Sequence, residues 1–298
     1  MVPTSSFYVV NPVAGKGKSL RIWREVEARL RHRREPVEFR ITPEPNTVAG
    51  IAEQAVRQGY DTIVAVGGDG TIREAAGVLA GSGCRLGIIP SGTGNDFART
   101  LGLPHDLDAL LDVVSTGNVM AADLGRIDGA YFVNIAGIGV DTEIVEAVNR
   151  SRVIVNGTVT YLLTAIRTVL GYDAPMMTVR VGGQEIRGRV LVLAIANGEY
   201  YGGGIRMVPG ARLQDGLFHV LVASDVGRWE ALRLLPLTYS GRHVTHKKCS
   251  IYTGSEVTVE SDRPLAVQAD GSVVGRVPVT FRVAPRALNV LMPAPLGR

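Results

Sequence analysis

The stretch Val66-Gly67-Gly68-Asp69-Gly70-Thr71-Ile72 joins an apolar run at residues 61–65 to a helical pattern at residues 73–79. The run predicts a buried strand of a parallel sheet. Glycines between a strand and a helix leave backbone N–H groups pointing at one spot, where the helix dipole also favours an anion such as phosphate. The stretch therefore indicates a nucleotide site, with a tight turn that merely needs glycine as the alternative.

Asp69 is an unusual residue for such a turn. A carboxylate beside phosphates repels them unless a magnesium ion bridges the two, or unless the group meets the nucleotide elsewhere. We interpret Asp69 as a magnesium-linked acid of the nucleotide site.

Two further loops repeat this arrangement. Residues 11–19 follow a short apolar strand at 7–10 and precede a helical pattern at 20–30, and residues 91–99 follow a strand at 85–90. The carboxyl ends of parallel strands lie at one edge of a sheet, where open α/β sheets bind ligands. The convergence of three loops favours a nucleotide site, although the first loop alone is equally compatible with a basic surface turn.

The order of the predicted elements sets the fold class. A strand at residues 37–42 and helices at 47–58 and 107–114 complete a β-α-β-α-β succession, which is typical of a doubly wound α/β sheet. After about residue 122, short strands separated by Asp-Gly and Gly-Gly turns predict a mostly β second domain; they are residues 119–124, 130–135, 177–181, 190–196, 217–222, 255–260 and 277–283. One helical insertion carries apolar residues that we assign to the core rather than to lipid contact: Tyr161, Leu162, Ala165, Ile166, Val169 and Leu170.

Composition and charge bound the class of protein. The 298 residues are 46% hydrophobic and 20% charged, with a formal net charge of +4, so we expect a globular chain without a nucleic-acid partner. Cys84 and Cys249 lie far apart without metal-ligand spacing, which favours a reducing cytoplasm over a disulfide framework. Because neither a signal-peptide pattern nor a run of about 18 apolar residues occurs, we expect only peripheral contact with a membrane.

A series of motifs occurs in the order found in a known family. Besides residues 66–72 and 91–99, they are Asn11-Pro12-Val13-Ala14-Gly15-Lys16, Asp123-Leu124-Gly125 with residues 132–139, Asp215-Gly216-Leu217, and the closing residues 284–293. Nearly the whole chain resembles the diacylglycerol kinase catalytic-domain family, most closely its bacterial lipid kinases, which are related to sphingosine and ceramide kinases.

The resemblance implies a fold and an activity. It implies an α/β fold with a doubly wound ATP-binding domain at residues 1–122, a β-sandwich lipid-acceptor domain at residues 123–287, and an active site between them. The last residues, about 288–298, would pack back on the first domain. The activity would be transfer of the γ-phosphate of ATP to the hydroxyl of a lipid such as diacylglycerol, by an enzyme that contacts the membrane surface peripherally.

The resemblance also implies site residues. ATP would be held by Asn11, Pro12, Val13, Ala14, Gly15, Lys16, Thr42, Gly67, Gly68, Asp69, Gly70, Thr71 and Thr93. Asp69, Asp96 and Asp123 would form an acidic network that organises Mg²⁺ and the phosphates, which agrees with the need of phosphoryl transfer for positioning and charge neutralisation. Asp215, with the backbone carbonyls of Arg212 and Leu217, resembles the family's magnesium site, and a plain Asp-Gly turn is the alternative there.

The sequence departs from the family at its general base. The family has a glutamate just after an Asp-Gly pair near the C-terminus, but Ser272 follows Asp270-Gly271 here. A serine hydroxyl does not take a proton from a lipid alcohol near neutral pH, so Asp270 is the candidate catalytic base. The alternatives are a slow kinase that lacks the roughly 10²–10⁴-fold contribution of a base, or a chain that binds nucleotide or lipid without catalysis. Arg73, where many relatives carry asparagine, either contacts phosphate or faces solvent.

The sequence leaves three further questions open: the kinase class, the acceptor and the oligomeric state. NAD-kinase-like small-molecule kinases share the Gly-Gly-Asp-Gly-Thr turn and a related two-domain plan, although residues 91–99 favour the lipid branch. Diacylglycerol, monoacylglycerol, a sphingoid base, a prenol and phosphatidylglycerol are all compatible acceptors. An exposed sheet edge in the second domain would allow a homodimer.

Overall fold

The chain forms two compact units. The computed structural model describes residues 6–44, 47–150 and 157–294, and it leaves the side chains of residues 148–162 undescribed. One unit consists of residues 1–124 with 285–298, and the other of residues 125–284. Residues 123–124 and 285–287 therefore belong to the first unit, whereas the sequence predicted them in the second domain. Among the helices within the described residues, we find none with the length and hydrophobicity of a transmembrane segment.

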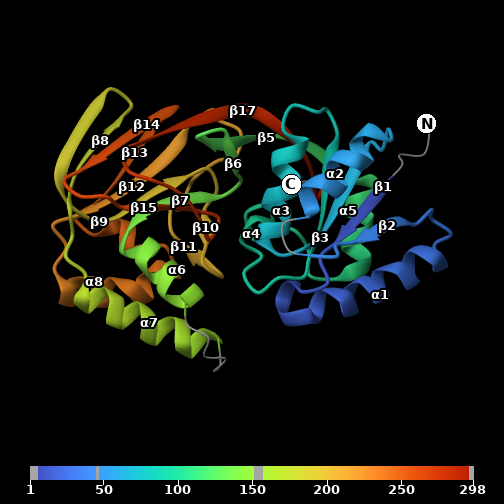
Figure 1. The fold of residues 1–298 in the computed structure, drawn as a ribbon, viewed down its shortest axis with the longest axis horizontal. Helices are drawn as coiled ribbons and strands as arrows, with labels where there is room; N and C mark the ends of the chain where they lie inside the picture. Colours follow the sequence, from blue (N-terminus) through green and yellow to red (C-terminus); the bar gives the residue numbers. More distant parts are fainter. Residues whose placement is uncertain (1–5, 45–46, 151–156, 295–298) are drawn as a thin grey trace. The chain divides into compact units, whose positions relative to one another are not determined.

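The first unit is built on a parallel sheet with the strand order β2-β1-β3-β4-β17 (Figure 1). Its strands are β1 (Ser6–Val10), β2 (Glu38–Ile41), β3 (Thr62–Gly67), β4 (Arg85–Pro90) and the last part of β17 (Val279–Met292), with β5 (Asn118–Ile127) paired to β17. Every residue of β3 is buried, because helices cover both faces of the sheet. This burial explains why its sequence is a continuous apolar run rather than an alternating one.

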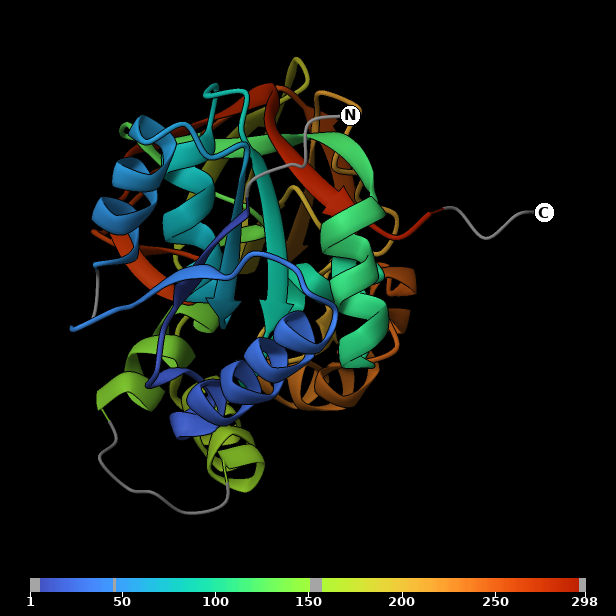
Figure 2. The same ribbon diagram turned by 90° about the vertical axis from the view of Figure 1, so that its right-hand side faces the viewer.

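Helices cover both faces of this sheet. They are α1 (Lys18–His32), preceded by the 3₁₀ turn η1 (Ala14–Gly17), α2 (Val48–Arg57), α3 (Asp69–Leu79), α4 (Asp96–Thr100) and α5 (Leu107–Thr116). Helices α1 and α5 lie on one face, joined by Arg33 to Asp108 and Asp112, while α2 and α3 pack together on the other (Figure 2). Right-handed crossovers require this, since the chain steps from β1 outward to β2 and then back past β1 to β3.

The strand order reverses between β1 and β3. Residues 11–17 follow β1 and residues 68–70 follow β3, so these two segments flank the point of reversal at the carboxyl edge of the sheet. Doubly wound sheets bind their ligands in the crevice at this point. The predicted doubly wound fold is confirmed, and it places the glycine-rich loops where a ligand is expected.

The second unit contains two antiparallel sheets that pack face to face. One holds β8 (Met176–Val181), β14 (Glu256–Ser261) and the first part of β17; the other holds β7 (Ile135–Gly139), β12 (Phe218–Ser224), β13 (Cys249–Gly254), β15 (Ala266–Ala269) and β16 (Ser272–Arg276). Strand β9 (Gln184–Ala196) pairs with β8 through its first half and with β7 and β12 through its second. Phe132, Phe218 and Phe281 meet in the core between the sheets, so the predicted β-sandwich is confirmed. Two short ribbons complete it: β5 with β6 (Ala130–Phe132), and β10 (Tyr200–Tyr201) with β11 (Ile205–Arg206).

A layer of helices covers the outer face of the second of these sheets. It consists of α6 (Val140–Arg150), α7 (Gly157–Gly171), α8 (Arg228–Leu234) and the 3₁₀ turns η2 (Leu235–Thr238) and η3 (Arg242–Thr245). The sequence analysis predicted only the insertion that became α7, and it missed α6 and α8. Ala165 and Val169 of α7 are buried, as assigned, whereas the side chains of Tyr161 and Leu162 lie outside the described residues.

Candidate functional site

The three glycine-rich loops of the first unit meet at the carboxyl edge of its sheet. Asn11 Nδ2 donates to Thr71 Oγ1 at 3.0 Å, which ties the loop after β1 to the first turn of α3. The Asn11 N–H donates to the Val66 carbonyl at 3.0 Å, and Ser91 Oγ lies 2.9 Å from Ser19 Oγ. The loops after β1, β3 and β4 are thus held together by side chains that the sequence motifs supply.

Glycines let these loops approach backbone to backbone. Gly15 has φ +59°, and a Cβ atom there would lie 2.1 Å from the Ser91 carbonyl oxygen. A Cβ atom on Gly92 would lie 2.5 Å from Gly68 Cα. Larger residues would force the loops apart, so these glycines are required by the fold itself.

Gly70 differs from these glycines, because nothing lies within 4 Å of where its Cβ would be. It is exposed in the first turn of α3, and its backbone does not adopt the left-handed region. Neither packing nor backbone strain within the described residues calls for a glycine at this position. The open space beside it is suited to a ligand that approaches the main chain closely.

Asp69 begins α3 and reaches across to the next loop. Its Oδ1 accepts a hydrogen bond from the Phe97 N–H at 3.1 Å, at the start of α4. Asn95, which precedes α4 with φ 54°, cannot cap that helix because its side chain bonds the backbone of Gly92 instead. Asp69 therefore acts as the cap of α4, and its Oδ2 has no donor among the described residues.

The other two predicted catalytic acids of this unit are buried in separate interactions. Asp96 Oδ1 pairs with Arg99 at 2.7 Å, and Asp123 Oδ1 accepts from the Arg286 N–H at 2.7 Å. Within the described residues no three His, Cys, Asp or Glu side chains gather into a group that could hold a metal ion. Asp69, Asp96 and Asp123 therefore do not form a ready-made cation site, and their shared role stays a prediction.

The remaining predicted nucleotide ligands lie around these loops. Thr42 is buried at the end of β2, where its N–H donates to the Val10 carbonyl, and Thr93 is exposed in the turn before α4. Lys16 is exposed with φ 59°, and Val13 is 63% exposed. Pro12 and Ala14 are half-buried beside them.

Asp270, the predicted base, holds the backbone of the second unit. Its carboxylate accepts hydrogen bonds from three successive N–H groups, those of Val133, Asn134 and Ile135, at 2.8, 3.0 and 3.2 Å. It sits in the left-handed region with φ 46°, next to the half-buried Ser272. This geometry anchors the start of β7, and it leaves the predicted catalytic role of Asp270 untested.

The predicted magnesium ligands lie in the loop before β12. Asp215 Oδ1 accepts from the Leu217 N–H at 3.1 Å, and Oδ2 lies 2.9 Å from His219 Nε2. One carboxylate with backbone carbonyl oxygens is donor chemistry that a hard cation accepts, since Mg²⁺ commonly keeps several waters beside one or two carboxylates. The donor types fit, although both oxygens of Asp215 already accept hydrogen bonds.

An apolar cavity of about 90 Å³ lies under the helical layer of the second unit. Aliphatic side chains form most of its wall, including Ile144, Val169, Leu191, Leu221 and Leu234. Its lining of hydrophobic residues with a few polar groups is typical of a small-molecule or lipid site, although its volume is below the roughly 300–1,000 Å³ that such sites usually have.

Asp141 is the charged residue in the wall of this cavity, among the described residues. Its Oδ2 accepts from Gln268 Nε2 at 3.3 Å, while its Oδ1 has no hydrogen-bond partner in the described structure. Burial raises the pKa of Asp141 to about 6, against the opposing effect of the Gln268 hydrogen bond. Gln268 in turn accepts from the Gly271 N–H at 3.1 Å, which links Asp141 to the turn that carries Ser272.

The sequence analysis did not single out Asp141. The one sequence feature that could have indicated Asp141 is its position directly after the apolar run at residues 135–140. It lies there at the start of a helix that was not predicted. His243, also in the cavity wall, bonds the Met207 carbonyl through Nε2 at 2.9 Å, and burial lowers its pKa. The histidine is therefore neutral, and Asp141 supplies the charge.

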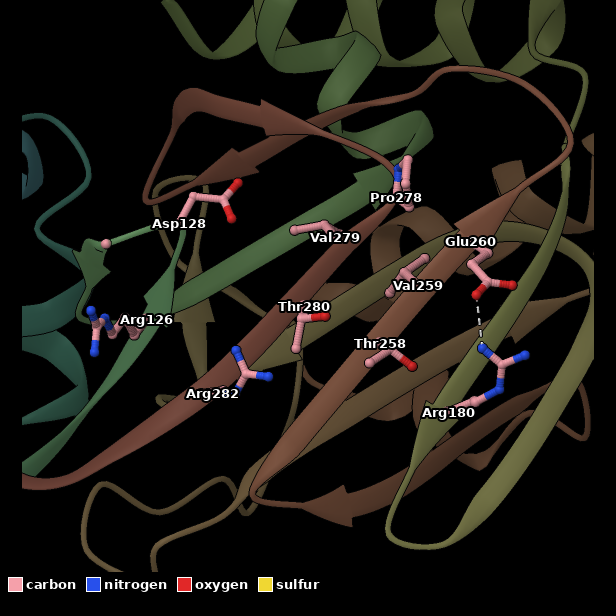
Figure 3. A pocket seen from close by; sticks show the side chains of 11 residues that line it. Arg126, Asp128, Arg180, Thr258, Val259, Glu260, Pro278, Val279, Thr280 and Arg282 are labelled. Carbon is pink, nitrogen blue, oxygen red and sulfur yellow. Dashed lines mark hydrogen bonds and ion pairs between the residues drawn. The ribbon is translucent and has the colours of Figure 1, made fainter.

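A second hollow, of about 600 Å³, lies on the exposed face of the β8–β14–β17 sheet (Figure 3). It is polar, and Arg180 pairs with Glu260 at 2.9 Å across neighbouring strands. Arg282 pairs with Glu256 at 2.7 Å in the same way. These cross-strand pairs stabilise the sheet face, so the apolar cavity is the better candidate for a lipid.

Comparisons with known proteins agree with this architecture. Residues 6–127 match the family described as the diacylglycerol kinase catalytic domain, and residues 134–292 match the YegS C-terminal NAD kinase beta sandwich-like domain. The chain is 32% identical over 292 residues to the diacylglycerol kinase of Mycobacterium tuberculosis H37Rv, covering 96% of this chain and 94% of that protein. It is 28% identical to the diacylglycerol kinase of Bacillus subtilis 168, covering 96% and 95%.

Solved structures show the same fold. A crystal structure described as a diacylglycerol kinase from Bacillus anthracis strain Sterne matches with a TM-score of 0.73 at 20% identity, over 98% of both chains. Another structure from that organism matches with a TM-score of 0.80 at 23% identity, over 97% of both chains. Taken with the two domain matches and the 32% identical relative, these findings show that the chain belongs to the diacylglycerol kinase catalytic-domain family and is a kinase of that type.

Proposed function

We propose that the protein transfers the γ-phosphate of ATP, bound with Mg²⁺, to the hydroxyl of a lipid such as diacylglycerol. A lipid acceptor is favoured by one observation, the apolar cavity of the second unit with the buried Asp141 in its wall. A polar small molecule such as NAD would find few hydrogen-bonding partners there. The three converging loops of the first unit support the choice of a nucleoside triphosphate as donor.

The nucleotide is held by main-chain amides and a single free carboxylate oxygen. Phosphoryl transfer depends on positioning and charge neutralisation more than on covalent chemistry. Asp69 would hold a cation through Oδ2 beside the phosphates, and Asp215 with the carbonyls of Arg212 and Leu217 would hold a second one. Bound Mg²⁺ would neutralise the phosphate charge. Asp69 also joins the start of α3 to the start of α4 through its hydrogen bond with the Phe97 N–H.

The acceptor hydroxyl is held by Asp141. A hydroxyl that donates to Oδ1 satisfies an oxygen that otherwise lacks a partner, and the aliphatic wall takes the adjoining methylenes. A volume of about 90 Å³ is small beside the roughly 300–1,000 Å³ of usual ligand pockets. A longer acyl segment therefore enters only when the residues that cover the cavity move aside.

The Ser272 position argues for slow turnover rather than for loss of activity. Positioning and charge neutralisation still give a rate without the glutamate, and this rate is lower by the contribution of the missing base. The second candidate function, nucleotide or lipid binding without transfer, rests on the same serine. Peripheral membrane contact is part of the proposal, because the acceptor is a lipid.

The assay that tests the proposal measures transfer of labelled γ-phosphate, with and without EDTA, to micellar lipids and to NAD. The lipid panel comprises diacylglycerol, monoacylglycerol, a sphingoid base, a prenol and phosphatidylglycerol. We expect label in one lipid, dependence on Mg²⁺, and a gain of about 10²-fold or more in Ser272→Glu. Label in NAD would overturn the proposal. No label in any lipid, with only Ser272→Glu active, would establish the binding function instead.

Gly70→Ala is expected to weaken nucleotide binding without weakening the fold. Alanine in a helical turn stabilises by about 0.5–1 kcal/mol over glycine, and no protein atom obstructs its Cβ. A phosphate lying against the main chain would meet the new methyl group, so we expect about tenfold lower ATP affinity by calorimetry. Gly77→Ala, on the same helix and also in open space, is the matched control and should bind ATP normally. Equal affinity in both variants would show that phosphate does not approach Gly70.

A further inference from the structure

Trp229 is the most exposed large apolar side chain within the described residues, at 72%. Tryptophan is mostly buried in proteins, and it is enriched where one side of a surface is apolar and the other wet. Helix α8 and η2 form one helical segment, residues 228–238, on which Trp229, Arg233 and Leu237 are spaced four residues apart. All three are exposed, so they form one outward stripe, and Tyr239 follows at 50% exposure.

The opposite side of the same segment forms part of the wall of the apolar cavity. The wall residues are Ala231, Leu234, Leu235 and Thr238. A surface helix normally has one apolar side, which faces the core, and a polar side, which faces water. The segment is apolar on the inside, as expected, and it also carries tryptophan, leucine and tyrosine on the outside.

Cations surround the stripe. Residues 225–248 contain five Lys and Arg against two Asp and Glu, an excess of three in a chain whose whole net charge is +4. Glu230, one of the two acids, already pairs with Lys248 at 2.6 Å and His246 at 3.2 Å. Arg228 and Arg233 of the segment are exposed, as are Arg242 and Lys247 later in the chain, against one exposed acid, Asp225, so this stretch carries a net positive charge.

We propose that this outward stripe, made of Trp229, Arg233, Leu237 and Tyr239, docks on an anionic lipid bilayer. Tryptophan and tyrosine settle at the level of the headgroups, leucine enters the acyl boundary, and the arginines bind lipid phosphate. The proposal rests on the proposed function, because a bilayer is where the lipid acceptor resides. The docked segment is also a wall of the cavity, so docking brings the membrane to the cover that an acyl chain has to displace.

Vesicle binding tests the docking surface independently of catalysis. The chain has two tryptophans, and Trp23 is 1% exposed, so intrinsic fluorescence reports mainly on the environment of Trp229. With vesicles of phosphatidylcholine containing phosphatidylglycerol we expect a blue shift, cosedimentation, and loss of both at high salt. With phosphatidylcholine alone we expect weak binding.

Two variants and a control complete the test. Trp229→Ser should lower the affinity for anionic vesicles about tenfold, and Arg233→Gln should lower its salt dependence. Val119→Ser, which removes a 50% exposed apolar side chain from β5, should bind as the native chain does. Phosphorylation of a short-chain, water-soluble diacylglycerol should be unchanged in Trp229→Ser. If that activity is absent from every chain, the proposed function fails while vesicle binding still stands.

Three results would overturn the docking proposal. One is no binding of the native chain to anionic vesicles. Another is equal binding of Trp229→Ser and the native chain. The third is a native dimer that becomes monomeric in Trp229→Ser without any vesicle binding, which would assign the stripe to contact with a second copy of the chain.

Discussion

Asp69→Asn is expected to abolish phosphotransfer while leaving the first unit folded. Asparagine keeps the Oδ1 acceptor for the Phe97 N–H, since asparagine and aspartate cap helices about equally well. It removes the negative charge that the free Oδ2 offers to a cation beside the phosphates. Loss of one electrostatic partner of this kind lowers the rate by about 10²–10³-fold. Transfer of label to lipid and thermal unfolding, measured on the same preparations, check the prediction.

Asp69→Ala separates the two roles of the carboxylate. It removes both the charge and the cap of α4, so we expect the same loss of activity together with a loss of about 1 kcal/mol of stability. If Asp69→Asn retains activity and only Asp69→Ala loses it, the residue is a structural cap, and the magnesium-linked role is wrong.

Asp141→Asn is expected to lower kcat/KM for the lipid about 10- to 100-fold without changing the KM for ATP. The range corresponds to the 1.5–3 kcal/mol that a hydrogen bond to a charged acceptor typically contributes. Because burial raises the pKa of Asp141 to about 6, the native activity should rise with pH through that value as the carboxylate ionises. The variant should lack this acid limb. A native profile that is flat from pH 5 to 7.5 would contradict the assignment.

Asp141 should affect stability in the opposite direction, because its ionisation raises activity but lowers the free energy of unfolding. The pKa of Asp141 rises from an ordinary 3.8 to about 6 in the folded chain, so between these values the folded state holds a proton that the unfolded state has lost. Stability therefore falls as pH rises through this window and stays low above it, by up to about 3 kcal/mol. Asp141→Asn should melt at the native temperature near pH 4 and several degrees higher at pH 7.5. Equal melting temperatures at pH 7.5 would show that the carboxylate is not isolated from water.

The glycine-rich loops and their shared sheet edge were predictable from sequence because their signals are local. A glycine-rich turn between an apolar strand and a helix can be recognised within about a dozen residues of sequence. Parallel strands then bring such turns to the same edge of the sheet. In the structure these turns do meet: Asn11 contacts Thr71, and Gly92 closely approaches Gly68.

The apolar cavity was not predictable because it is assembled from distant segments. Asp141, Gln268 and the α8 segment come together only through the pairing of β7 with β15 and of β12 with β13. The hydrophobic periodicity of the sequence does not indicate which strands pair with each other. The partner of Asp123 was not predictable for the same reason, since Asp123 accepts from Arg286, which is 163 residues away in the chain.

Strand β17 has a consequence for how the chain becomes folded. Its first part belongs to the antiparallel sheet with β14, and its last part pairs with β4 of the parallel sheet. A ribosome that has made residues 1–124 has made all three glycine-rich loops but not the strand that closes the edge of β4. Until residue 292 emerges, that edge stays open to pairing with other chains, and a fragment cut after residue 124 should aggregate. The first unit therefore completes its folding last, although most of its residues are synthesised first.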